Sequence, residues 1–203
     1  MYKLYYSPEA CSLAVHIALE ELNADFTPFR VNIGEEVSPE LLEVNPMATV
    51  PVLIDDDLIL TEGVGILNYL ADHFPQSQLR PVAGKLRGEF YQWLNILSAG
   101  LHRSYCRVFD PGAYVKSEQA ADEVYEVADN EVQEMFTFFN EHLAQRSYLL
   151  GEQISFVDFY LFAMLGWTDA LTRPLSSYRN LSAYYERIRV RPAVQRAYAT
   201  ENE

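Results

Sequence analysis

The chain has 203 residues, of which 49% are hydrophobic and 22% are charged, a composition typical of a folded globular protein. Its formal net charge of −14 argues against nucleic-acid binding, which needs clustered Lys and Arg, and against binding to an anionic membrane surface. No apolar run reaches the length of a transmembrane helix, and the chain is long enough for one large domain or two small ones.

Strand and helix patterns alternate through the first eighty residues. Phe29, Val31 and Ile33 alternate with polar residues, as in a half-buried strand. Ser38 followed by Pro39 predicts a short helix with the serine as its cap. The predicted elements are a strand over residues 3–6, a helix over 12–22, a strand over 29–33, a short helix from 38, strands over 50–54 and 58–60 joined by a turn at 55–57, and a helix over 62–74.

The second half of the chain is predicted to be helical. Residues 75–84 hold two prolines and a glycine and look like an interdomain linker. Beyond them, Ser155 with Asp158 predicts a capping box at the start of one helix. The predicted helices cover residues 86–101, 117–144, 155–167, 181–190 and 193–198. The sequence therefore predicts an α/β domain over residues 1–77 and an all-α domain over residues 85–203.

Cys11 lies after the first predicted strand and turn, at the start of the first predicted helix. Backbone N–H groups and the helix dipole favour an anion there, and a thiol in this setting can have a lowered pKa that makes its thiolate available. The alternative is a small buried residue that closes the turn, and the local pattern favours neither. Cys11 and Cys106 form no spaced framework and no secretory signal is expected, which is typical of a reduced cytoplasmic protein.

The negative charge is concentrated in the first part of the chain. Residues 1–80 hold three basic and thirteen acidic side chains, a net charge of −10, whereas residues 81–203 have a net charge of −4. An anionic ligand on the first domain must therefore rely on helix dipoles, on backbone N–H groups or on arginines from the second domain.

The order of these elements, with a cysteine at the first helix and a helical second half, resembles the cytosolic glutathione S-transferase family. The resemblance covers nearly the whole chain and implies a thioredoxin-like first domain. It rests on the order and spacing of four motifs. Asn45-Pro46 followed by Val50-Pro51 is similar to the family's cis-proline segment, and Thr61-Glu62-Gly63 is similar to the site for the γ-glutamyl end of glutathione. Residues 155–158 are similar to a helix-capping motif, and Arg191-Pro192 is similar to the C-terminal segment.

Within the family, Cys11 places the chain nearest the bacterial beta class, in which the matching cysteine contacts the glutathione sulfur and can form a mixed disulfide with it. The resemblance implies a cytoplasmic homodimeric enzyme with glutathione as co-substrate, no metal, and a hydrophobic electrophile or a disulfide as second substrate. It implies Cys11 and His102 as catalytic residues, and a glutathione site made of Ala10, Cys11, Val50, Pro51, Glu62, Gly63, Asn95 and Arg103.

A peptide-like ligand suits this site for physical reasons as well. A cis-proline forces a tight turn and leaves the backbone N–H and C=O of Val50 able to pair with a peptide as an added strand. Glu62 can hold an ammonium group. The N–H groups of Glu62 and Gly63, at a helix N-terminus, favour a carboxylate.

Some positions depart from the family pattern. They are Gly63, where many relatives have a hydroxyl; Glu35 and Glu36, where beta-class relatives often have a lysine; and Ala99 and Gly100, where relatives have polar dimer contacts. Because the first domain lacks that lysine, we expect Arg103, with Arg107, to supply positive potential to the glycyl carboxylate of glutathione.

Several alternatives stay open on the sequence alone. Ser12 rivals Cys11 as the contact to the glutathione sulfur, whereas His16 is expected to be packed or capped within its own helix. The chemistry is either conjugation by the glutathione thiolate, or thiol transfer and peroxidase activity through Cys11, although Ala14 excludes a Cys-x-x-Cys disulfide. A non-catalytic ligand-binding or protein-interaction module that has lost strong glutathione binding is the non-enzymatic alternative.

Overall fold

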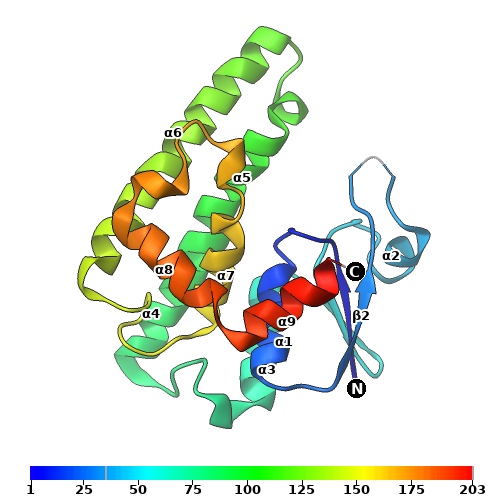
Figure 1. The fold of residues 1–203 in the computed structure, drawn as a ribbon. Coiled ribbons are helices and arrows are strands. Elements are labelled where there is room, and N and C mark those ends of the chain that lie inside the picture. The colour runs from blue at the N-terminus through cyan, green and yellow to red at the C-terminus, as the bar shows by residue number, and fades with distance from the viewer. Residues whose placement is uncertain (35, 203) are drawn as a thin grey trace. The chain divides into compact units, whose positions relative to one another are not determined.

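The structure, a computed structural model, describes residues 1–34 and 36–202. Its elements fall into two compact units, one formed by Met1–Val82 together with Ile188–Glu203 and the other by Ala83–Arg187. Figure 1 shows the elements of each unit, coloured along the chain. Glu35, which departs from the family pattern, lies outside the described residues.

The first unit is built on a four-stranded sheet with the strand order β2-β1-β3-β4. Its strands are β1 (Tyr2–Tyr6), β2 (Phe26–Arg30), β3 (Val52–Asp55) and β4 (Leu58–Thr61). β1 and β2 are parallel, which requires a crossover helix between them, whereas β1–β3 and β3–β4 are antiparallel. This mixed sheet confirms the predicted βαβ and ββα order.

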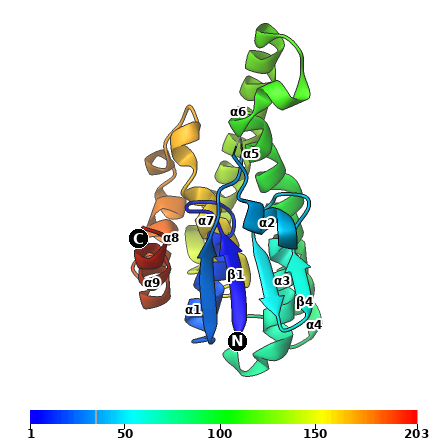
Figure 2. The same cartoon turned by 90° about the vertical axis from the view of Figure 1, so that its right-hand side faces the viewer.

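The two faces of the sheet bury different side chains because residues alternate along a strand. Tyr6 faces α1, where its ring lies 5.2 Å from that of His16. Tyr5 faces the other way and packs against a cluster that includes Val52 and Leu41. Figure 2 shows α1 and α3 behind the sheet. The core of this unit therefore has one layer on each side of the sheet.

The helices of the first unit are α1 (Leu13–Glu21), α2 (Pro39–Val44), α3 (Gly63–His73) and α9 (Pro192–Glu201), with a 3₁₀ turn η1 (Pro75–Ser77). Every residue of α1 from Leu13 to Leu19 is buried, because the sheet covers one side of the helix and α9 packs along another (Figure 1). The last helix of the chain thus packs with the first unit. The predicted domain boundaries, 1–77 and 85–203, stay a prediction.

The predicted position of the second strand is wrong. β2 covers Phe26–Arg30 instead of residues 29–33, and it pairs with β1 from Tyr2 opposite Phe26 to Tyr6 opposite Arg30. β2 is an edge strand, which is why it can contain Pro28. Ser38 is the N-cap residue of α2 and Pro39 is its first residue, as predicted. The Ser38 hydroxyl accepts the N–H of Asn32 at 2.8 Å and makes no capping bond to α2, so it closes the preceding loop.

The second unit is helical, as predicted. Its elements are α4 (Gly84–Asn95), the π-helical segment η2 (Ile96–Leu101), α5 (His102–Phe109), α6 (Glu118–His142), α7 (Phe156–Leu165) and α8 (Arg179–Arg189), with 3₁₀ turns η3 (Pro111–Tyr114), η4 (Leu143–Gln145), η5 (Thr168–Ala170) and η6 (Leu175–Ser177). The two-part architecture, a mixed sheet with helices followed by a helical unit, is the predicted fold class. α7 ends at Leu165, two residues before the predicted end.

The π-helical segment η2 was not predicted from the sequence. It joins α4 to α5 and contains Gly100, where an added Cβ would lie only 3.1 Å from Cε of Met135 on α6. A side chain at position 100 would therefore require the end of the Met135 side chain to shift by a few tenths of an ångström. Leu97 and Leu101 remain fully buried, so the change of helical period keeps the apolar stripe directed inward.

The predicted capping box of α7 is confirmed. Asp158 accepts hydrogen bonds from the N–H and the hydroxyl of Ser155, both at 2.8 Å, from the N–H of Leu149 at 2.9 Å and from the hydroxyl of Tyr184 at 3.0 Å. Every residue of α7 is buried. The Asp158 carboxylate therefore ties the start of this central helix to α8 and to the segment before it.

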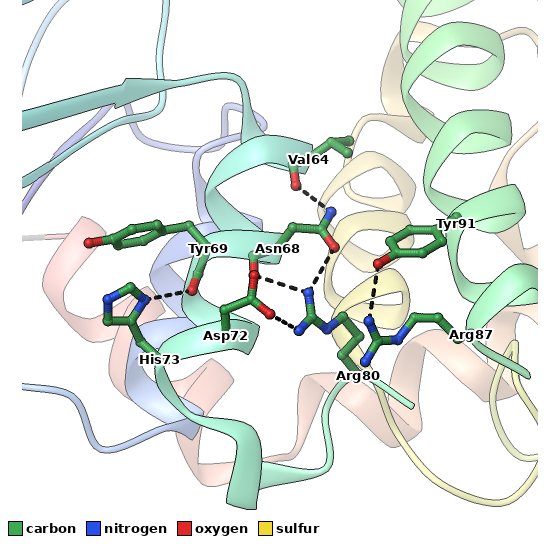
Figure 3. Close-up of polar contacts among 8 residues, drawn as sticks. All are labelled: Val64, Asn68, Tyr69, Asp72, His73, Arg80, Arg87 and Tyr91. Carbon is green, nitrogen blue, oxygen red and sulfur yellow. Dashed lines mark hydrogen bonds and ion pairs between the residues drawn. The ribbon is translucent and has the colours of Figure 1, made fainter. Parts of the chain in front are cut away.

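Arg80 attaches the linker to α3 (Figure 3). Its guanidinium donates to the backbone oxygen of Asn68 at 3.3 Å and to the side-chain oxygen of the same residue at 3.4 Å, and it forms an ion pair with Asp72. These contacts place a positive charge at the last turns of α3, where the helix dipole favours it.

Among residues 1–34 and 36–202, the structure has no helix with the length and hydrophobicity needed to cross a membrane.

Candidate functional site

Three connections meet at one edge of the sheet in the first unit. Tyr5 of β1 pairs with Val52 of β3, and Val52 pairs with Thr61 of β4. The chain that leaves β1, the chain that enters β3 and the chain that leaves β4 are therefore at the same edge. These connections carry Ala10 and Cys11, Val50 and Pro51, and Glu62 and Gly63. Six of the predicted site residues are thus brought together by strand register.

The loop between β1 and α1 is closed by its own hydrogen bonds. The N–H of Ala10 donates to the Ser7 carbonyl at 3.1 Å, and Glu9 has a φ of 60° within this turn. The Ser12 hydroxyl accepts the N–H of Ser7 at 3.3 Å and donates to the Ser7 carbonyl at 3.2 Å. Ser12 is fully buried, and its hydroxyl is committed to the loop.

Cys11 lies in the turn that leads into α1. Its carbonyl accepts the N–H of Ala14 at 3.2 Å, which places it at the helix N-terminus, as predicted. Its side chain is partly exposed, and Sγ donates to the carbonyl oxygen of Val50 at 3.3 Å. The thiol is therefore next to the segment that was predicted to pair with a peptide-like ligand.

The segment before β3 is held by Asn45. This buried side chain donates to the Thr49 carbonyl at 2.8 Å and accepts the N–H of Met47 at 3.1 Å. The Val50–Pro51 peptide bond is cis, which confirms the expectation from the family resemblance. Val50 is buried and its carbonyl faces the Cys11 thiol.

Glu62 and Gly63 form the junction between β4 and α3. Glu62 is exposed, with φ 67° and ψ 109°, and its carbonyl accepts the N–H of Ile66 at 3.0 Å. A positive φ is unfavourable for a residue with a side chain, and such strain is found preferentially at functional sites. Gly63, the first residue of α3, is buried. The junction thus presents an exposed carboxylate beside a helix N-terminus.

The second unit carries the other predicted site residues. His102, at the start of α5, has its Nδ1 3.0 Å from the Tyr160 hydroxyl, and its ring centroid lies 5.4 Å from that of Trp167. Burial lowers the pKa of His102 below its usual value, and the charge of the adjacent Arg103 lowers this pKa further. His102 is therefore a neutral, oriented imidazole near neutral pH.

Asn95 and Arg103 are exposed on α4 and α5, and the Asn95 amide donates to the Tyr91 carbonyl at 2.8 Å. Arg107, which we expected to add positive potential, is paired within the second unit. Its guanidinium forms an ion pair with Glu131 of α6 and donates to the Ser104 hydroxyl at 3.1 Å. Because Glu131 neutralises its charge, Arg107 is a poor source of positive potential for a ligand.

Two contacts at these sites were not predicted from the sequence. His16 is packed in the core, one of the two expected arrangements, and its Nδ1 lies 2.9 Å from a carboxylate oxygen of Glu201 on α9 instead of being capped within its own helix. Tyr160 contacts His102 from 58 positions away. No local spacing signals either pair, because each partner lies on a separate helix.

The part of the chain that the structure describes holds no group of three or more His, Cys, Asp or Glu side chains arranged for a metal ion.

Comparison with known proteins gives the same result for both halves of the chain. The family model "Glutathione S-transferase, N-terminal domain" matches residues 1–72, and "Glutathione S-transferase, C-terminal domain" matches residues 106–192. The protein "Glutathione S-transferase GstA" of Escherichia coli O157:H7 is 34% identical over 204 residues, which cover 98% of each chain.

Solved structures of bacterial proteins have the same fold. A sphingomonad glutathione S-transferase complexed with glutathione has a TM-score of 0.86 and 35% identity, and the match covers 98% of each chain. A beta-class glutathione S-transferase of Sphingomonas chungbukensis has a TM-score of 0.85 and 35% identity, again over 98% of each chain.

Proposed function

The chain belongs to the glutathione S-transferase family, and from this premise we propose that it holds glutathione at the sheet edge of the first unit, and that it either transfers glutathione to an electrophile or exchanges it with a disulfide through Cys11. The acceptor is a hydrophobic electrophile or a disulfide. Structural relatives include a beta-class enzyme, and a relative with bound glutathione supports glutathione as the co-substrate. The observation that carries the proposal is the meeting of the Cys11 loop, the Val50–Pro51 segment and the Glu62–Gly63 junction at one edge of the sheet.

Each part of glutathione has a matching group there. The γ-glutamyl ammonium pairs with the Glu62 carboxylate, and the γ-glutamyl carboxylate takes the N–H groups at the start of α3. The peptide backbone pairs with Val50, whose carbonyl has a second lone pair besides the one that accepts from Cys11. We propose that the exposed Arg103 supplies positive charge to the glycyl carboxylate, and that His102 contributes from the second unit as a neutral imidazole.

The proposal assigns the contact with the glutathione sulfur to Cys11 instead of Ser12. The Cys11 side chain is partly exposed, whereas the Ser12 hydroxyl is buried and bonded to Ser7. In conjugation, the glutathione thiolate forms a C–S bond with the electrophile, and the leaving group departs with its electron pair. In thiol transfer, the Cys11 thiolate attacks one sulfur of glutathione disulfide, forms a mixed disulfide and releases a glutathione thiolate.

Retention on immobilised glutathione, together with conjugation of glutathione to a chlorinated dinitrobenzene, tests this function. We expect the wild-type protein to be retained and to form the conjugate. Cys11→Ser and Cys11→Ala are expected to remove glutathione-dependent reduction of a small disulfide, because Ala14 leaves no second thiol in the motif. A folded wild-type protein that neither binds glutathione nor forms conjugate would favour the non-catalytic alternative.

We predict that the Cys11 thiol has a pKa below the unperturbed value of about 8.5, because it lies at the N-terminus of α1. The rate of alkylation by iodoacetamide, measured against pH, checks this. Cys106 is the internal reference, and Cys11→Ala identifies its contribution. A Cys11 reaction that titrates at or above the unperturbed value would contradict the prediction.

We also predict a homodimer, as the family resemblance implies, with Asn95 near the interface. The second unit has a shallow pocket of about 460 Å³ between η2, α5 and α6, lined in part by Met135 and by Phe138, which is 49% exposed. Light scattering at micromolar concentration should give twice the chain mass of 23.3 kDa. Phe138→Asp is expected to lower this mass, whereas Ile59→Asp, at an exposed position on β4, should not. A wild-type mass close to 23.3 kDa would contradict the dimer.

A further inference from the structure

The C-terminal helix α9 packs along α1 and is joined to it at both ends. At one end, Arg191 pairs with Glu21 and Arg196 pairs with Glu20, and Arg196 also donates to the Glu20 carbonyl at 2.8 Å. These side chains are partly exposed, so each ion pair contributes little to stability. They fix the two helices to each other without contacting the loop that carries Cys11.

At the other end, the Glu201 carboxylate is buried, with only 3% of the residue exposed. One of its oxygens lies 2.9 Å from Nδ1 of the fully buried His16, and the other accepts the backbone N–H of Glu9 at 3.1 Å. A carboxylate only accepts hydrogen bonds, so Nδ1 of His16 carries the proton. Glu201 therefore connects α1 to the loop between β1 and α1.

Helix stability does not explain a carboxylate at this place. Glu201 is the last residue of α9, and the negative end of a helix dipole disfavours an anion there. Burial of a carboxylate is also costly unless it is well paired. Both partners of Glu201 lie outside α9, which suggests that its position is set by what it holds.

One of these partners belongs to the strained part of the Cys11 loop. Glu9 has a φ of 60° in the turn from Ser7 to Ala10, two residues before Cys11. Its N–H donates to Glu201 in this conformation. A second tie lies nearby, where the Tyr6 hydroxyl donates to the Thr200 carbonyl at 3.4 Å. The end of α9 thus holds the loop at Glu9, the residue with the unfavourable positive φ.

We propose that Glu201 is a positioning residue for Cys11. Through the N–H of Glu9 it fixes the loop that keeps the Cys11 thiol against the Val50 carbonyl, and His16 orients its carboxylate. The inference rests on the proposed function in one respect, namely that Cys11 is the reactive group. It assigns to the last residue of α9 a role in the site at the N-terminus of α1.

Two conservative substitutions separate positioning from charge. Glu201→Gln keeps the reach of the side chain: its oxygen can accept from Glu9 while its amide donates to Nδ1 of His16. His16 then carries its proton on Nε2, which is buried without a hydrogen-bond partner among the described residues, so this variant keeps the contact with the loop at a cost in stability. Glu201→Asp keeps the charge but is one methylene too short to reach both partners. Arg196→Ala is the matched control, because it removes a contact between the same helices without touching the loop. All variants carry Cys106→Ser, so that Cys11 is the single thiol.

The first readout is the rate of Cys11 alkylation by iodoacetamide as a function of pH. Glu201→Asp is expected to slow alkylation near neutral pH by about tenfold, the effect of losing one hydrogen bond to a charged group, while Glu201→Gln and Arg196→Ala stay within about twofold of the parent. The opposite order, with Gln changed and Asp unchanged, would show that Glu201 acts through its charge and would overturn the proposal. Equal rates in all variants would also overturn it.

The second readout does not depend on the reactivity of Cys11. Amide hydrogen exchange over residues 7–12 should be faster in Glu201→Asp than in Glu201→Gln or Arg196→Ala, because the loop loses its tie at Glu9. If Cys11 of the parent protein reacts no faster than a free thiol, the proposed function fails, whereas the exchange data still decide whether Glu201 holds the loop. Unchanged exchange in a folded Glu201→Asp protein would overturn the positioning role.

Discussion

Replacing Asp158 by alanine is expected to lower the free energy of unfolding by about 3–5 kcal/mol, because several buried donors lose their acceptor at once. The carboxylate is fully buried and accepts from the Leu149 N–H, from both donors of Ser155 and from the Tyr184 hydroxyl. The alanine side chain can accept none of these bonds, and the site is closed to solvent in the folded protein, where Asp158 is fully buried. Thermal and urea unfolding, followed by circular dichroism, measure the loss.

The loss should also depend on pH. Burial raises the pKa of Asp158 to about 6, although the hydrogen bonds from Leu149, Ser155 and Tyr184 lower it. The unfolded chain has a pKa near 3.9, so the folded state binds the proton more tightly. The proton on Asp158 therefore adds to the free energy of unfolding. This stabilisation is complete below about pH 4 and is lost as the pH rises through about 6. The difference between wild type and Asp158→Ala is therefore expected to be larger near pH 5 than near pH 8.

Ser117→Ala is the matched control, since it removes a single cap. The Ser117 hydroxyl accepts the N–H of Ala120 at the start of α6, in an exposed position where water can replace it. Its loss is expected to cost about 0.5–2 kcal/mol. Equal destabilisation by the two substitutions would mean that Asp158 acts only as a helix cap and not as the link between α7, α8 and the preceding segment.

The elements of the fold could be predicted wherever local pattern and packing agree. Ser155 and Asp158 satisfy each other within one turn, so their spacing is sufficient to predict the cap of α7. β2 was misplaced because alternation over residues 29–33 has no relation to burial there: Ile33 is exposed, and the position of the strand is set by pairing with β1. The π-helical segment η2 places Gly100 next to Met135 of α6, a contact between helices that no spacing within one helix reveals.

In the candidate site, too, some residues could be predicted from local sequence and others could not. Cys11, the Val50–Pro51 segment and the Glu62–Gly63 junction each have a local sequence signal, and the register of β1, β3 and β4 brings them together. The supporting contacts have no such signal. Glu201 reaches His16 across 185 positions, and Arg107 pairs with Glu131 because α5 packs on α6. Long-range packing between helices decides these contacts, and the pattern of a single helix does not contain it.

Glu62→Ala is expected to raise the Kd for glutathione about tenfold or more, since a hydrogen bond to a charged group is worth about 1.5–3 kcal/mol. Glu62 is the exposed carboxylate at the sheet edge where the Cys11 loop and the Val50–Pro51 segment meet, and its backbone is held at a φ of 67°. Isothermal titration calorimetry measures the affinity, and circular dichroism confirms that each variant is folded.

Three further variants show which property of Glu62 matters. Glu62→Gln retains an acceptor for the ligand ammonium and should weaken binding less than alanine does. Glu62→Gly tolerates the positive φ and should fold at least as stably as wild type, yet it should lose affinity as alanine does. Asp57→Ala removes an equal charge from the β3–β4 turn, at the opposite edge of the sheet, and should leave affinity unchanged. Wild-type affinity in folded Glu62→Ala would show that the first unit binds glutathione through backbone groups and the helix dipole alone. An equal loss in Asp57→Ala would show that the effect depends on the net charge of the unit and not on a contact made by Glu62.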